Sequence, residues 1–406
     1  MPRSVEQHLA DVLSGVEPLP PFELSLLDAR GCRLSLDVIA PGELPAFSSA
    51  TREGFAVRVA DLESASIEHP VPLLVVDDVL PGRRPRLAVV PGAAVRVHLG
   101  SALPEGTEAV VVAEDVEFAD DVVTMSAPVS LGAHVRQAGA ELAAGARVLT
   151  AGSRIDARRI SLLAALGLGR VNAHPRPRVV VVTIGDELVE PGASLLPGTV
   201  PDSNGVMLSA LVQQLGAVAY RVGPVADDVD TLRQVLEDQL VRADLILAVG
   251  GISASSYEAI VEVANGLGEM AIHRVDMLPG IAQGIGHLGD DRIPVLTLPG
   301  HPAAAFVAFE VFAKPVIRRM AGAPEVATEA VRAELLAGVR SPAGRKQYIP
   351  SQRVPGSDGV LRVQPLHSEH VTAELAQADC LLVVPEVIEE LLAGDFVDVI
   401  LLDGVA

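Results

Sequence analysis

Tryptophan is absent from this chain of 406 residues, and aromatic side chains together make up only 3% of it. Because the apolar share is nonetheless 49%, valine, leucine and alanine must fill the interior. A chain of this length can bury several hydrophobic cores, so we expect it to divide into two to four domains.

Cysteine and long apolar runs are also scarce. Cys32 and Cys380 give neither a disulfide framework nor the ligand spacing of a metal site. No apolar run approaches the length needed to cross a bilayer, and Met1-Pro-Arg-Ser4 is not followed by the apolar segment of an export signal. We therefore expect a cytoplasmic protein without direct membrane insertion.

Lysine occurs only at Lys314 and Lys346, so arginine supplies nearly all of the positive charge. The formal net charge is −21, and this excess of acid argues against nucleic acid as a partner, because phosphate backbones require clustered cations. An anionic ligand would need a local basic pocket or a divalent metal ion.

Three short apolar runs, each ending in a glycine or proline turn, are the most informative feature that the sequence does contain. Residues 179–183 lead into Ile184-Gly-Asp-Glu-Leu188, residues 245–249 into Gly250-Gly-Ile-Ser253, and residues 293–298 into Pro299-Gly-His-Pro302. We expect each turn to open into a helix, which predicts parallel strands in a doubly wound α/β sheet. The carboxyl ends of such strands share one edge, where glycine lets backbone N–H groups approach an anion.

The remaining segments predict further domains. Residues 1–20 and 176–323 are expected to form the α/β domain, and residues 21–45 and 131–175 a connecting α+β lobe. Recurring short strands predict a β-rich lobe at 46–130 and a C-terminal β domain at 324–406. Ser4-Val-Glu-Gln7 has capping-box spacing, and Asp230 is expected to cap a later helix.

Several motifs occur in one order along essentially the whole chain. They are Val95-Arg96, Leu103-Pro-Glu-Gly106, residues 109–111, Thr183-Ile-Gly-Asp-Glu-Leu188, Asp202-Ser-Asn204, Gly250-Gly-Ile-Ser253 and Leu298-Pro-Gly-His-Pro302. This ordered set resembles the molybdopterin molybdenumtransferases, which include the MoeA proteins and the E domain of gephyrin. The resemblance implies a MogA-like α/β domain with β-rich lobes, a C-terminal β-barrel, a dimer-forming connecting lobe and an elongated homodimer.

The same resemblance implies a reaction, the insertion of molybdate into adenylated molybdopterin with release of a nucleotide. Mg²⁺ is the expected metal ion, because carboxylates would hold a divalent ion beside phosphate. The expected metal ligands are Asp186, Glu187 and Glu258, and the expected catalytic residues are Glu53, Glu141, Glu187 and Asp228. The expected pterin contacts are Asp202, Ser203, Asn204, Gly250, Gly251, Ser253, Pro299, Gly300 and Pro302.

Many of these residues also have an ordinary structural interpretation. Asp186 can cap the following helix, and Asp227 with Asp228 can complement a helix dipole. Residues 202–204 can close an Asx turn, and residues 299–302 can serve only as a helix entry. His301 replaces the family's asparagine and is expected to be a cap or a solvent contact, while Tyr348 is expected to be packed.

The departures from the family pattern fall mainly at charged positions. The family's D-N-S-A-M-D-G-Y-A reads Ser48-Ser-Ala-Thr-Arg-Glu-Gly-Phe-Ala56, the threonine of R-I-M-T-G-A becomes Leu99, and the family's K-P-G-K-P reads Leu278-Pro-Gly-Ile-Ala282. Each lost lysine–phosphate contact removes about 1.5–3 kcal/mol, which amounts to roughly two to four decades of affinity for two contacts. Arg274, His273 and Arg292 are the neighbouring groups that can compensate.

Three functions therefore stay open, and the first two belong to different classes. One is a Mg-dependent molybdenumtransferase. The other is a gephyrin-like homodimeric scaffold that has lost the chemistry and binds a peptide of a cytoskeletal or membrane-receptor protein, an alternative that rests on analogy of fold. A third is a sensor that binds the pterin without turning it over.

Overall fold

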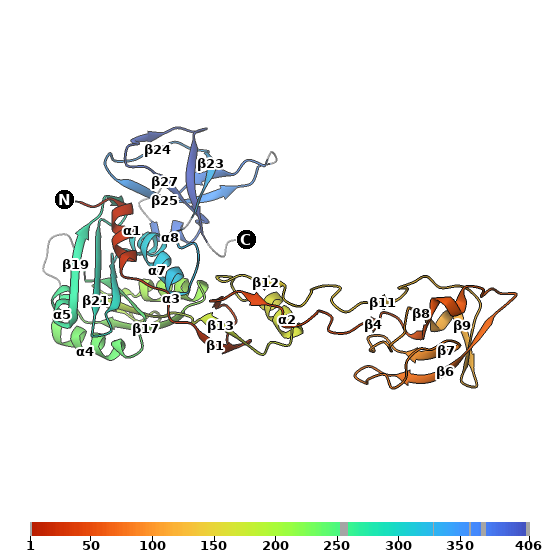
Figure 1. Ribbon diagram of the computed structural model, residues 1–406. Helices are drawn as coiled ribbons and strands as arrows, with labels where there is room; N and C mark the ends of the chain where they lie inside the picture. The colour runs from red at the N-terminus through yellow and green to blue at the C-terminus, as the bar shows by residue number, and fades with distance from the viewer. Residues whose placement is uncertain (1, 252–258, 328, 357–358, 367–370, 403–406) are drawn as a thin grey trace. The chain divides into compact units, whose positions relative to one another are not determined.

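The computed structural model describes residues 2–251, 259–327, 329–356, 359–366 and 371–402. The chain forms two compact units (Figure 1). Unit 1 comprises Met1–Ser35, Gly152–Asp156 and Val171–Ala406, and unit 2 comprises Leu36–Ala151 and Ala157–Arg170. Each unit has its own sheets and its own hydrophobic cores.

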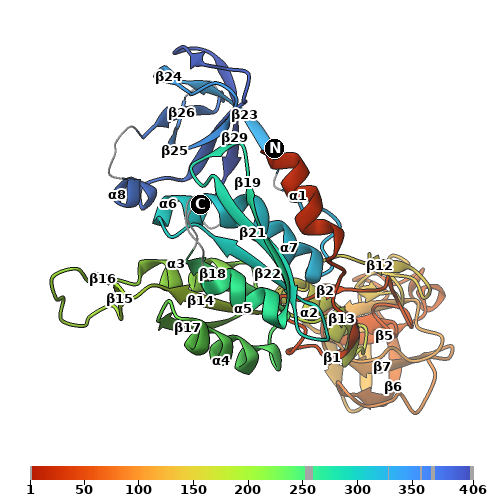
Figure 2. The same cartoon turned by 90° about the vertical axis from the view of Figure 1, so that its left-hand side faces the viewer.

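A six-stranded sheet lies at the centre of unit 1 (Figure 2). Its first four strands are parallel, and the fifth runs antiparallel to its two neighbours. The strand order is β17 (Val218–Val225), β14 (Arg178–Ile184), β18 (Leu245–Gly250), β22 (Ile293–Leu298), β21 (Ala282–Leu288) and β19 (Gly268–Arg274). The three apolar runs of the sequence are therefore adjacent parallel strands, as predicted.

Helices cover both faces of this sheet. Val179 and Val181 of β14 join the core that contains α1, α3 and α6, whereas Val180 and Val182 join the core that contains α4 and α5. Because successive residues of a strand face opposite sides, a continuous valine run suits a sheet that is covered on both faces. The predicted doubly wound α/β fold is confirmed. The helices are α1 (Val5–Ser14), α3 (Ser203–Gln214), α4 (Val229–Leu240), α5 (Ala259–Leu267) and α6 (Pro302–Ala308).

The structure confirms one predicted helix start and corrects two others. Ser4 and Gln7 form the predicted capping box of α1. The turn after β14 does not open into a helix, because the chain first forms β15 (Leu188–Val189) and its partner β16 (Val200–Pro201) before α3 begins. The N-cap of α4 is Asp228, and Asp230 lies in the first turn. Among the helices of the described ranges, none is long and apolar enough to span a membrane.

An irregular helical segment follows β22. The helix α6 continues through a π-helical turn, η3 (Phe309–Ala313), into α7 (Lys314–Met320). Glu310 and Lys314 form a buried ion pair of 2.9 Å across this turn.

The C-terminal part of unit 1 is a closed five-stranded barrel, which confirms the predicted β-barrel. The ring closes because β25 pairs with both β26 and β27, while β29 links β27 to β23, which in turn pairs with β26. Tyr348 of β25 is buried, as predicted, and this burial raises the pKa of its hydroxyl. The strands are β23 (Ala330–Leu335), β25 (Lys346–Val354), β26 (Arg362–Pro365), β27 (Cys380–Val384) and β29 (Phe396–Leu401).

Smaller elements complete unit 1. The strand β20 (Met277–Leu278) extends the barrel sheet by pairing with β25. A three-stranded sheet consists of β1 (Phe22–Ser25), β13 (Arg170–His174) and β2 (Arg33–Leu34). The remaining elements are the paired strands β24 (Val339–Arg340) and β28 (Glu390–Leu391), and the short helix α8 (Val371–Leu375).

Unit 2 contains a second six-stranded sheet. Phe55, Leu73 and Met125 belong to its larger core, and Val79 and Val95 belong to a second one. The strand order is β8 (Ala109–Val112), β5 (Gly54–Val57), β7 (Ala93–Val97), β6 (Val71–Val79), β10 (Val122–Met125) and β9 (Val116–Ala119). The unit also holds α2 (Ala157–Ala165), the 3-10 turns η1 (Val59–Leu62) and η2 (Ala113–Asp115), and the paired short strands β3 (Val38–Ile39) with β12 (Arg147–Leu149) and β4 (Ser49–Ala50) with β11 (Val135–Arg136).

Candidate functional site

The carboxyl ends of β14, β17, β18 and β22 meet at one edge of the unit 1 sheet, and glycines let their turns touch. A Cβ on Gly250 would lie 2.4 Å from the carbonyl oxygen of Ile184, and a Cβ on Gly300 would lie 3.5 Å from the Cα of Gly250. Gly250 also has a φ of 87°, which other residues rarely adopt. We call this edge the rim, and define it as residues 185–187, 226–228, 250–251 and 299–302.

Asp202 is fully buried and fixes the start of α3 beside the rim strand β14. Its Oδ1 accepts a hydrogen bond of 2.9 Å from the backbone N–H of Gly205. Its Oδ2 accepts one of 2.8 Å from Thr183 Oγ1 and another of 2.8 Å from Arg221 Nη2. Both carboxylate oxygens of Asp202 therefore accept hydrogen bonds from the protein itself. These contacts agree with the interpretation that residues 202–204 close a turn.

Asn204 links the first turn of α3 to the rim. Its Nδ2 donates a hydrogen bond of 2.6 Å to the carbonyl oxygen of Gly300. Its Oδ1 is buried and has no hydrogen-bond partner within the described part of the chain. Ser203, the first residue of α3, is exposed. The structure thus brings Asn204 and Gly300, two of the expected pterin contacts, together.

Besides Asp228, three carboxylates lie on the rim. Asp186 Oδ1 accepts a hydrogen bond of 3.2 Å from the backbone N–H of Asp227, and the position of a Cβ on Gly251 lies 3.7 Å from Asp227 Oδ1. The side chain of Glu187 folds back over its own turn. Its carboxylate would lie 2.6 Å from a Cβ placed on Gly185. All three acids are exposed, and Asp186 and Asp227 are in contact. Since no helix follows Asp186, its helix-capping interpretation is wrong.

Asp228 makes a capping contact. Its Oδ1 accepts a hydrogen bond of 3.0 Å from the backbone N–H of Thr231, in the first turn of α4. This bond lowers the pKa of Asp228, because it stabilises the ionised carboxylate.

The third rim turn leads directly into a helix, as predicted. Pro302 is the first residue of α6, a position where the missing N–H of proline has no cost. His301 occupies the N-cap position but makes no capping hydrogen bond through its side chain, and it is exposed. His301 is therefore a solvent contact and not a side-chain cap of the helix.

The segment that replaces the family's lysine motif packs against the rim. A Cβ on Gly280 would lie 3.4 Å from the ring of Pro299 and 3.7 Å from the Cβ of Ala304. Leu278 and Ile281, which stand at the two lysine positions, are half-buried. Aliphatic residues therefore stand two positions before and one position after Gly280, the residue that packs against the third rim turn.

Two of the three groups considered as substitutes, His273 and Arg274, lie at this edge of the sheet, because they end β19. Arg292 precedes β22 and so lies at the opposite edge, where it donates a 2.6 Å hydrogen bond to Glu269. His273 packs its ring 5.8 Å from that of His8. Arg274 is exposed and ends β19, which runs in the same direction as β22, so it lies at the rim edge.

Glu53 and Glu141 belong to unit 2, and each has an ion-pair partner there. Glu53 Oε1 lies 3.5 Å from His98 Nδ1, and Glu141 pairs with Arg136. Ser48 links the segment that contains Glu53 to the segment that leads to Glu141. Its Oγ donates to Gln137 Oε1 and accepts from the backbone N–H of Ala138.

Ser253 and Glu258 lie outside the described residues. Within the ranges that the structure does describe, no group of three or more histidine, cysteine, aspartate or glutamate side chains has the geometry of a metal site.

Two residues that organise the site were not predicted from the sequence. Thr183 and Arg221 both donate to the buried carboxylate of Asp202. Thr183 gives a signal in the sequence, because it is a hydroxyl residue that ends a buried valine run. Arg221 gives none, since its partner lies 19 positions away and only the packing of β17 against α3 brings them together.

The order of domains and the site match one known class of protein. Residues 3–167 match the MoeA N-terminal region (domain I and II), residues 180–319 match a probable molybdopterin binding domain, and residues 332–402 match the MoeA C-terminal region (domain IV). The chain therefore has the complete MoeA-type architecture, with a MogA-like α/β domain and a C-terminal barrel.

Similarity to individual proteins extends over the full length. The chain is 35% identical to molybdopterin molybdenumtransferase 2 of Mycobacterium tuberculosis over 398 residues, which cover 97% of this chain and 98% of that protein. It is 34% identical to molybdopterin molybdenumtransferase 1 of the same organism over 98% of both. The crystal structure of the molybdopterin biosynthesis moeA protein from Pyrococcus horikosii superposes with a TM-score of 0.84, at 28% identity and over 99% of both chains. The chain belongs to the molybdopterin molybdenumtransferase family.

Proposed function

We propose that this chain acts in molybdenum cofactor biosynthesis, where it binds adenylated molybdopterin at the rim and inserts molybdate with release of the nucleotide. The observation that carries the proposal is the contact between the turns of β18 and β22 at Gly250 and Gly300, residues that have no side chain of their own to cover the main chain. Backbone N–H groups at the carboxyl edge of a parallel sheet are a common site for phosphate.

The neighbouring side chains hold this main chain in place. Asn204 fixes the carbonyl oxygen of Gly300, and Asp202 fixes the first turn of α3. The buried Oδ1 of Asn204, which has no hydrogen-bond partner among the described residues, supplies one acceptor for a donor group of the pterin. Positioning a phosphate and a pterin ring relative to each other in this way favours reaction, because it removes the entropy cost of orienting them in the transition state.

The rim carboxylates fit a Mg²⁺ ion that is shared with the substrate. Mg²⁺ takes oxygen ligands and commonly binds through one or two protein carboxylates together with water and substrate phosphates. Asp186 and Asp227 are in contact and would hold it, with Glu187 as a neighbour. When bound, the ion would neutralise charge that develops on phosphate oxygens.

A reconstitution assay tests this proposal. Purified protein, adenylated molybdopterin, molybdate and Mg²⁺ should release nucleotide above the level in buffer alone. Asp186→Asn should reduce the rate, whereas Asp291→Asn, which alters an exposed acid just before β22 at the opposite edge, should not. Wild-type protein that releases no nucleotide would refute the proposal.

The aliphatic pair Leu278 and Ile281 favours a second candidate function, a homodimeric scaffold that binds a short peptide. Hydrocarbon beside the rim cannot solvate phosphate but can pack against apolar side chains. Light scattering should give the mass of a dimer under either proposal. Micromolar or tighter binding of the adenylated pterin in calorimetry would count against a purely scaffolding role.

A further inference from the structure

Two consecutive aspartates lie on different sides of β6 in unit 2, next to a β-bulge. The strand β6 pairs in parallel with β7, and the register shifts between Val75 and Asp77, so that Val76 is an extra residue. Because successive residues of a strand face opposite sides, the side chain of Asp77 is 2% exposed, whereas that of Asp78 is 51% exposed.

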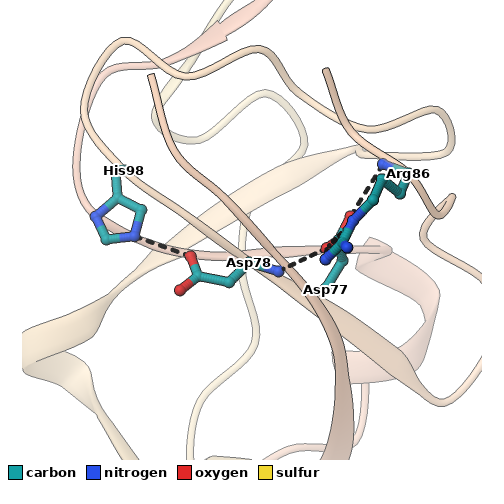
Figure 3. A network of polar contacts seen from close by, with 4 residues as sticks. All are labelled: Asp77, Asp78, Arg86 and His98. Atoms are coloured by element: carbon teal, nitrogen blue, oxygen red, sulfur yellow. Dashed lines mark hydrogen bonds and ion pairs between the residues drawn. The ribbon is translucent and has the colours of Figure 1, made fainter. Parts of the chain in front are cut away.

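Asp77 locks this strand end in place (Figure 3). It accepts a 2.9 Å hydrogen bond from the backbone N–H of Arg86, a 2.8 Å bond from Arg86 Nη2 and a 3.0 Å bond from the backbone N–H of Asp78. These bonds lower the pKa of Asp77, with the side-chain bond from Arg86 as the main cause. The buried carboxylate therefore stays ionised and fixes the backbone from which Asp78 projects.

His98 lies between two carboxylates of unit 2. Its Nε2 is 2.9 Å from Asp78 Oδ1, as Figure 3 shows, and its Nδ1 is 3.5 Å from Glu53 Oε1. The backbone is fixed as well, because the N–H of His98 donates to Ser101 Oγ and the buried Ser101 donates its own N–H back to the carbonyl oxygen of His98. The ring is thus held from its backbone and from Asp78, and it presents its remaining nitrogen to Glu53.

We propose that His98 is a positioning residue that holds the carboxylate of Glu53 for the transfer reaction. This inference rests on the proposed transferase function. Glu53 stands where the family pattern has the shorter aspartate, and the glutamate side chain has one more rotatable bond. A fixed donor at Nδ1 restricts this extra freedom.

The geometry excludes a simpler explanation, a metal ion shared by these side chains. The two carboxylates face opposite nitrogens of one ring, so a single ion cannot contact both of them and the imidazole.

A double-mutant cycle in the full-length protein tests the inference through nucleotide release. His98→Ala should lower kcat by about ten- to a hundredfold with little change in KM, which is typical of losing a group that orients another. In a Glu53→Gln background the same substitution should have almost no further effect, because the group that it positions has already been disabled. A purely structural role would lower activity by the same factor in both backgrounds, and that additive result would overturn the inference.

Two amide variants separate the two ring nitrogens. The amide nitrogen of asparagine reaches the position of Nδ1, whereas that of glutamine reaches the position of Nε2. His98→Asn, which keeps a donor towards Glu53, should therefore retain more activity than His98→Gln. The reverse order would contradict the assignment. Arg147→Ala, which breaks the exposed 3.3 Å ion pair with Asp37 in the same unit, serves as the control and should combine additively with Glu53→Gln.

The two proposals fail in different ways. If the wild-type protein releases no nucleotide, the transferase function fails and this role of His98 fails with it. If the wild-type protein is active and the cycle is additive, only the inference about His98 fails. The nitrogen NMR shifts of the His98 ring report the contact without turnover, and they should change in both Glu53→Gln and Asp78→Asn. Unchanged shifts in either variant would also overturn the inference.

Discussion

The side-chain amide of Asn204 donates a 2.6 Å hydrogen bond to the carbonyl oxygen of Gly300, which ties the start of α3 to the turn after β22. Two segments almost a hundred positions apart are thereby held together at the carboxyl edge of the sheet. A change at Asn204 should consequently be felt at the rim rather than in the core.

Asn204→Ala should weaken binding of molybdopterin about two- to tenfold, because one hydrogen bond contributes about 0.5–1.5 kcal/mol. Isothermal calorimetry measures this change. Ser209→Ala is the matched control, since the hydroxyl of Ser209 donates to the backbone of its own helix, at Gly205. Equal affinities in the two variants would show that the Asn204–Gly300 contact does not shape the site.

Gly250→Ala should lower the free energy of unfolding by about 2–4 kcal/mol, because the new Cβ would meet the carbonyl oxygen of Ile184 and the backbone has a positive φ. Gly192→Ala separates these two causes. Gly192 has a φ of 94° but nothing within 4 Å of its Cβ position, so its variant should lose only about 1 kcal/mol. Chemical denaturation followed by circular dichroism compares them. Equal losses in the free energy of unfolding of the two variants would show that the contact between the turns does not require glycine at position 250.

The sequence predicted the α/β sheet because a strand buried on both faces leaves a continuous apolar run, as at 179–183. It also placed the rim, since the ends of parallel strands must share an edge. It did not predict that Asp202 is buried beneath Arg221 and Thr183, because those contacts depend on packing between distant segments. The bulge at Val76 was equally hidden, since the sequence of β6 reads as a regular strand.

His8 should make the stability of unit 1 depend on pH. Burial lowers its pKa to about 4, with smaller contributions from His273 and Arg3 that Asp11 partly opposes. The unfolded chain takes up a proton near pH 6.5 and the folded chain only near 4, so stability should be lost as the pH falls through this window. The loss due to His8 is roughly 3 kcal/mol.

The variant His8→Leu isolates this contribution. His8 packs its ring 4.8 Å from that of Phe312, and its Nδ1 has no hydrogen-bond partner in the described part of the chain, so a leucine should be tolerated. Between pH 7 and pH 4 the wild-type free energy of unfolding should fall by more than that of the variant, as measured by denaturation at each pH. Parallel curves would mean that His8 titrates alike in the folded and unfolded chain.

Restoring the two lysines should strengthen ligand binding at the rim. Leu278 and Ile281 are half-buried and lie near Gly280 in the sequence, which packs against Pro299 of the rim, so a long side chain at either position can extend its charged end to solvent. Leu278→Lys combined with Ile281→Lys should therefore raise the affinity for adenylated molybdopterin at least tenfold, since each charge-assisted bond to phosphate contributes about 1.5–3 kcal/mol. The gain should shrink as salt is added, because exposed charges are screened.

Calorimetry at low and high salt measures this gain, and Val241→Lys provides the control. Val241 is 86% exposed and directly follows α4, so its lysine adds one positive charge, half of that of the double variant, to unit 1 away from the 278–282 segment. If Val241→Lys raised the affinity as much as the double variant does, the effect would come from net charge alone. If neither variant raised it, Arg274 at the end of β19 already supplies the cation, and Arg274→Ala should then weaken binding by about tenfold or more.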